Sequence, residues 1–76
     1  MQVLGRRISP SILLKLRERM QESPISAEGL ESVANDQGLS RKDDLAMRVT
    51  ERLIQRERLA GNIMLEGITW IWVGEE

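Results

Sequence analysis

The spacing of hydrophobic residues predicts a first helix near the N-terminus. Ser9–Pro10 marks its start, because serine is a favoured N-cap and proline is favoured at the first helical position. The apolar stripe that follows has helical spacing and consists of Ile12, Leu13, Leu16 and Met20. We predict a helix over Pro10–Gln21, which Ser23–Pro24 ends because proline disfavours helical geometry in the residue before it. Residues 1–7 show no clear pattern, so the ordered core is expected over about 9–73.

A second, shorter helix is predicted over Ala27–Asp36. Ser26 is a good N-cap, and Glu28 in the first turn faces the positive end of the helix dipole. Gly38 suits the position just past the helix end, where a left-handed backbone is common. The apolar face of this helix consists of Leu30, Val33 and Ala34.

The longest helical pattern runs over about Arg41–Ala60. Ser40 and Asp43 have the spacing of a capping box, with aspartate in place of the preferred glutamate. Gly61–Asn62 ends the pattern. The apolar stripe consists of Leu45, Val49, Leu53 and Ala60, flanked by Ala46 and Leu59.

The C-terminal segment changes to residues that favour β-strands. Ile63–Leu65 and Ile68–Val73 are predicted strands, and Glu66–Gly67 between them can form a tight turn. Because side chains alternate along a strand, every second residue shares a face. The face expected to pack as core consists of Ile68, Trp70 and Trp72.

The order of helix, helix, turn, longer helix and β-hairpin is carried by ISAEGLESVANDQGLSRKDDLAMRVTERLIQRERLAGNI followed by EGITWIW. Over roughly Ser9–Val73 the chain resembles a winged helix-turn-helix domain. The resemblance implies one α+β domain over residues 1–76, a small winged helix with three helices, a helix-turn-helix and a two-stranded β-hairpin wing. It implies that Ile25 is a short strand paired with the wing. It also makes Arg41–Ala60 the recognition helix, whose N-terminal half enters the major groove.

The same resemblance implies a DNA-binding transcriptional regulator. One module of this size offers limited contact area, which favours a homodimer or a protein partner. Arg41, Lys42 and Arg48 are the expected phosphate or base contacts, and Met47 the contact to a thymine methyl group. The expected DNA-binding residues are Ser40, Arg41, Lys42, Asp44, Met47 and Arg48.

The formal net charge of −1 hides a pattern of charged blocks. Residues 1–20 carry five basic residues and one acidic, 21–46 two and six, 47–61 four and two, and 62–76 none and three. The acidic wing is poorly suited to phosphate contact, which arginine and lysine normally make. Arg48 and Glu51 lie at helix-neighbour spacing, as do Arg52 and Arg56, which favours a solvated face of ion pairs.

A protein-interaction winged helix is the alternative function, as an adaptor, inhibitor or regulatory subunit that binds no nucleic acid. If the core side of the third helix is centred near Val49, the opposite side carries the apolar residues Met47 and Ile54 where solvent is expected. The expected partner-binding residues are Asp43, Met47, Glu51, Ile54 and Arg58.

Composition argues against catalysis. The chain has no cysteine and no histidine, so thiolate nucleophiles, imidazole bases and the usual zinc ligands are missing. Asp43–Asp44 is interpreted as a helix-start pair stabilised by the dipole. We expect no enzyme activity, no cofactor and no metal. No apolar run approaches the ~20 residues that a membrane span needs, so a cytoplasmic protein without membrane partners is expected.

Overall fold

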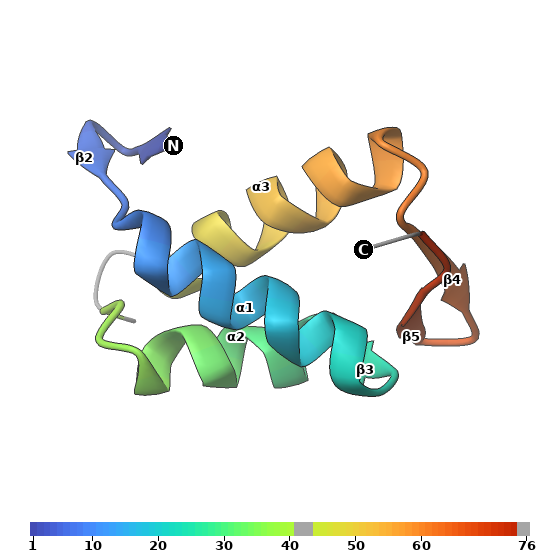
Figure 1. Ribbon diagram of the computed structural model, residues 1–76. Helices are drawn as coiled ribbons and strands as arrows, with labels where there is room; N and C mark the ends of the chain where they lie inside the picture. Colours follow the sequence, from blue (N-terminus) through green and yellow to red (C-terminus); the bar gives the residue numbers. More distant parts are fainter. Residues whose placement is uncertain (41–43, 75–76) are drawn as a thin grey trace.

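Three helices and five short antiparallel strands make up the part of the chain that a computed structural model describes, residues 1–40 and 44–74 (Figure 1). The helices of this part are α1 (Pro10–Glu22), α2 (Ala27–Asp36) and α3 (Leu45–Leu59). Its strands are β1 (Gln2–Val3), β2 (Arg6–Arg7), β3 (Ile25–Ser26), β4 (Ile63–Glu66) and β5 (Thr69–Trp72). The predicted α+β class is confirmed.

The first two helices begin at the serine caps that the sequence predicts. Ser9 Oγ accepts from the Ser11 amide at 3.3 Å, and Pro10 occupies the first helical position. Ser26 Oγ accepts from the Gly29 amide at 3.0 Å. The predicted bounds of α2 are confirmed, and α1 extends one residue beyond its predicted end.

A glycine in the left-handed region ends α2. Gly38 has φ +102°, and its amide donates to the Asn35 carbonyl at 3.0 Å. The next amide, of Leu39, reaches back to the Ala34 carbonyl at 3.2 Å, which completes a Schellman motif. Leu39 is thereby turned into the core, where it is 6% exposed.

The third helix begins later than predicted. Asp44 is its N-cap and has φ +57°, a left-handed conformation that a right-handed helix starting at Arg41 cannot contain. The predicted start and the capping box on Ser40 are therefore wrong; Arg41, Lys42 and Asp43 lie outside the described residues. The helix body packs against α2, β4 and β1.

Strands β3, β5 and β4 form an antiparallel sheet in that order. Ile25 pairs with Trp70, which confirms the predicted short strand between the first two helices. Met64 pairs with Ile71, and Glu66 with Thr69, so β4 is the outer strand on the side away from β3.

The loop of the β4–β5 hairpin lies one residue later than predicted. Glu66 is the last paired residue of β4, and Thr69 Oγ1 donates to its carbonyl at 3.0 Å. Gly67, with φ +63°, and Ile68 form the two-residue loop. Ile68 is therefore not a strand residue sharing the tryptophan face, and it is 82% exposed at the hairpin tip.

An N-terminal hairpin was not predicted. Gln2 pairs with Arg7 and Val3 with Arg6, around a loop in which Leu4 and Gly5 have φ +53° and +74°. Two successive positive φ values are the requirement of a type I′ turn. The expected core over 9–73 begins too late, because Val3 is only 4% exposed and packs with the core cluster.

The core lies where the three helices of the described chain meet the sheet. Its most completely buried apolar side chains are Leu16, Met20, Leu30, Ala34, Ala46, Val49 and Leu53. Trp70 and Trp72 are half-buried and pack against this cluster, as predicted. The helices and sheet thus fix the position of α3, whose outer face remains accessible.

Candidate functional site

The exposed face of α3 carries a row of arginines. Arg48, Arg52 and Arg56 follow one another at intervals of four residues, the spacing of neighbours on one side of a helix. All three are exposed, and we call them the arginine row. Glu51 and Gln55 lie on the same exposed face beside the row.

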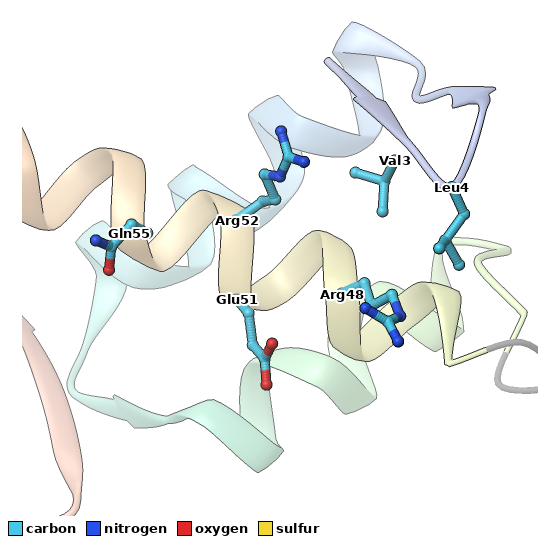
Figure 2. A pocket seen from close by; sticks show the side chains of 6 residues that line it. All are labelled: Val3, Leu4, Arg48, Glu51, Arg52 and Gln55. Carbon is cyan, nitrogen blue, oxygen red and sulfur yellow. The ribbon is translucent and has the colours of Figure 1, made fainter.

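Two members of the arginine row have no partner within the described residues. Arg48 and Arg52 form no hydrogen bond or ion pair there, whereas Arg56 Nε lies 3.6 Å from Glu57 Oε2. The ion pair expected between Arg48 and Glu51 is not formed in this part of the chain. Figure 2 shows that the side chains of Arg52 and Glu51 point away from each other. Both unpaired guanidinium groups are therefore available to an external anion.

The N-terminal hairpin and α3 enclose an open groove along the arginine row (Figure 2). One part of about 360 Å³ is lined by Val3, Leu4, Arg48, Glu51, Arg52 and Gln55. A second part of about 410 Å³ is lined by Met1, Gln2, Arg52, Gln55, Arg56 and Leu59. Arg52 and Gln55 line both parts, so the groove continues along the helix.

Two buried apolar residues, one before and one after the turn, hold the N-terminal hairpin in place. Val3 and Ile8 are 4% and 3% exposed, and the Ile8 amide donates to the Met1 carbonyl at 2.9 Å. The turn between them then projects Leu4 beside Arg48, with 51% of its surface exposed. Arg7, on β2, is also exposed on this hairpin.

A buried carboxylate fixes the far end of α3. Glu57 is 3% exposed, and its Oε1 accepts from Arg17 Nε at 3.2 Å and from Asn62 Nδ2 at 2.9 Å. The Arg17 guanidinium also lies over the Trp72 ring, 5.5 Å from its centroid. These contacts join α1, α3 and the β4–β5 hairpin, and so set the direction in which the arginine row points.

The structure describes four of the six residues expected to bind DNA. Arg48 is exposed on the outer face of α3, Met47 is partly buried, and Asp44 is exposed at the N-cap. Ser40 is half-buried before the helix, and its carbonyl accepts from the Ala46 amide at 3.1 Å. Arg41 and Lys42 lie outside the described residues.

The expected partner-binding face is not an exposed apolar stripe. Ile54 is buried, at 7% exposure, so the expectation that it faces solvent beside Met47 is wrong. Glu51 and Arg58 are exposed as expected, and Asp43 lies outside the described residues. The buried side of α3 also includes the polar residues Thr50 and Glu57. Its centre therefore lies away from Val49, the centre inferred from apolar residues alone.

Sequence reasoning placed Arg52 and Arg56 on a solvated face of ion pairs with Arg48, but did not count either among the candidate site residues. Their spacing of four residues was a usable signal, since it places them in one row wherever the helix core lies. The contribution of Leu4 and the N-terminal hairpin had no comparable signal.

In the described residues no group of three or more acidic, histidine or cysteine side chains could hold a metal ion. No helix in this part of the chain is both long enough and apolar enough to cross a membrane. Comparisons with protein-family models, with curated proteins and with solved structures find no match to this chain.

Proposed function

We propose that the chain is a winged helix-turn-helix domain. The order β3, α2, α3, β4, β5 supports this assignment, together with the pairing of β3 on β5. In such domains the helix before the hairpin is the one presented to the major groove. By this assignment α3 is the recognition helix and the β4–β5 hairpin is the wing.

We infer that the domain binds duplex DNA through the exposed face of α3, as a transcriptional regulator. The observation that carries this proposal is the arginine row, two of whose members are unpaired within the described residues. Arginine provides both the phosphate contacts that give affinity and the bidentate contacts that read guanine. Among the described residues that line the groove, Glu51 is the one acidic side chain.

The wing makes no phosphate contact in this proposal. Residues 62–76 contain no lysine or arginine, so this segment has no cation for a phosphate. The flanking basic element is instead the N-terminal hairpin, with Arg7 exposed on β2. DNA contact is thus proposed for α3 and this hairpin, together with Arg41 and Lys42, which precede α3 in the sequence.

A titration of fluorescently labelled random-sequence duplex with the full chain at low salt tests the proposal by anisotropy. We expect binding that weakens as salt rises, because counterions are released from the phosphates. Arg48→Glu and Arg52→Glu should each weaken binding about tenfold or more and reduce the salt slope by about 1.

Lys15→Glu is the matched control, because it makes the same charge change at an exposed position on α1 that does not line the groove. It should leave most of the affinity intact. Absence of binding by the unchanged chain at low salt contradicts the proposal. Equal losses for Lys15→Glu and Arg48→Glu contradict the assignment of the interface to α3.

A further inference from the structure

The β4–β5 hairpin exposes large apolar side chains on both faces and at its tip, which the proposed DNA interface does not use. Met64 and Leu65 are each 53% exposed, Ile68 is 82% exposed, and Val73 just after β5 is 52% exposed. The only charged residue of the hairpin is Glu66. An apolar projection of this kind is typical of a protein contact and not of a phosphate contact.

The outer edge of this hairpin is an unpaired strand. β4 ends the three-stranded sheet, with β5 on one side and no described strand on the other. Its ladder with β5 runs without a bulge, and Ile63–Glu66 contains no proline or lysine. Edge strands that must stay unpaired commonly carry such protective features. This edge is therefore open to a further strand.

The hairpin register shows which backbone groups face the open edge. Glu66 and Thr69 flank a two-residue loop, so this pair exchanges hydrogen bonds across the hairpin, and Met64 with Ile71 repeats the pattern. Ile63 and Leu65 alternate with them and turn their N–H and C=O groups outward. An added antiparallel strand therefore pairs best when its own outward N–H and C=O groups lie opposite those of Ile63 and Leu65.

We propose that the occupant of this edge is a second copy of the chain, paired antiparallel through β4 about a two-fold axis at Met64. In this register Ile63 of each copy lies opposite Leu65 of the other, so the outward backbone groups of both strands are matched. Met64 meets Met64 of the second copy as a close, non-hydrogen-bonded pair. The two sheets then become one sheet of twice the width, in a closed isologous contact.

Side chains beside β4 support a second copy over another partner. Antiparallel pairing brings the hairpin tip of each copy to the base of the other, where α3 ends just before β4. Ile68 at the tip and Leu59 at the base are 82% and 76% exposed, and each provides an apolar neighbour for the other. The tip also carries an acidic side chain, Glu66, and the base a basic one, Arg58, so the charges of tip and base are complementary.

Sedimentation of the full chain over a range of concentrations tests this dimer without DNA, so its outcome is separate from that of the proposed DNA binding. The unchanged chain should form a concentration-dependent dimer. Met64→Lys should raise the dimer Kd about tenfold or more, because two like charges then meet at the axis. Leu14→Lys is the matched control: Leu14 on α1 is also 53% exposed, and this variant should dimerise normally.

Single cysteine variants test the register, since the chain has no cysteine of its own. Met64→Cys should form an interchain disulfide readily under mild oxidation, because the axis brings the two copies of this residue together. Ile68→Cys is more exposed but lies far from the axis, and it should cross-link much more slowly. A chain that remains monomeric at the highest concentration overturns the proposal, as does faster cross-linking through Ile68→Cys.

Discussion

Glu57 shows how one side chain can decide the orientation of an element. Its carboxylate accepts from Arg17 on α1 and from Asn62 before β4, while Arg56 approaches the second oxygen. A buried carboxylate is costly without such partners, so these residues act as a set. The set anchors the C-terminal end of α3, where the arginine row ends.

Glu57→Ala should lower the free energy of unfolding by about 2 kcal/mol, because Asn62 Nδ2 and Arg17 Nε lose a shared acceptor. For a domain of this size that corresponds to a fall in Tm of about 10 °C, measured by thermal unfolding. Glu57→Gln keeps an acceptor oxygen and should lose about half as much. Equal Tm values for the unchanged chain and Glu57→Ala contradict this role.

Thr50 presents the opposite case, a buried hydroxyl without a partner. It is 2% exposed, and no hydrogen-bond partner for its Oγ1 lies among the described residues. Thr50→Val should stabilise the protein by about 1 kcal/mol, since the unsatisfied group is replaced by a methyl group. Thr50→Ser keeps the hydroxyl and loses the methyl, so it should lower the free energy of unfolding. Urea unfolding distinguishes the two; a fall in stability for both variants argues against an unsatisfied hydroxyl.

At the scale of elements, prediction succeeded where local chemistry decides the structure. The serine caps of α1 and α2 and the glycine after α2 follow from short-range preferences and were predicted correctly. The Ile25 strand, implied by the resemblance to a winged helix, is also present. The buried face of α3 depends on tertiary contacts, because Thr50 and Glu57 join the core beside apolar residues. A pattern of apolar residues alone therefore misplaced Ile54, and the left-handed Asp44 had no sequence signal.

The N-terminal hairpin was missed because its turn carries an unusual residue. A type I′ turn favours Asn-Gly, whereas this chain has Leu4 at φ +53° before Gly5. Leu4→Asn should stabilise the protein by about 1 kcal/mol, since asparagine tolerates the left-handed region far better than leucine does. Gly5→Ala should destabilise it, because Gly5 has φ +74°. Thermal unfolding checks both signs, and a loss of stability in Leu4→Asn contradicts the turn assignment.

At the scale of the whole molecule, charged and apolar surfaces lie at different places. The arginine row and the N-terminal hairpin lie along α3, whereas the nearly uncharged β4–β5 hairpin projects beyond the C-terminal end of that helix (Figure 1). The net charge of −1 conceals this separation. The arrangement fits one surface that binds an anion and another that binds protein.

The most direct test of the central claim is to follow the amide chemical shifts of the isotope-labelled chain during a titration with duplex DNA at low salt. The proposed interface predicts the largest changes between Arg48 and Arg56 and on the N-terminal hairpin, with little change in β4 and β5. Changes centred on β4 and β5, or no changes at all, would contradict the assignment of α3 as the DNA-binding element.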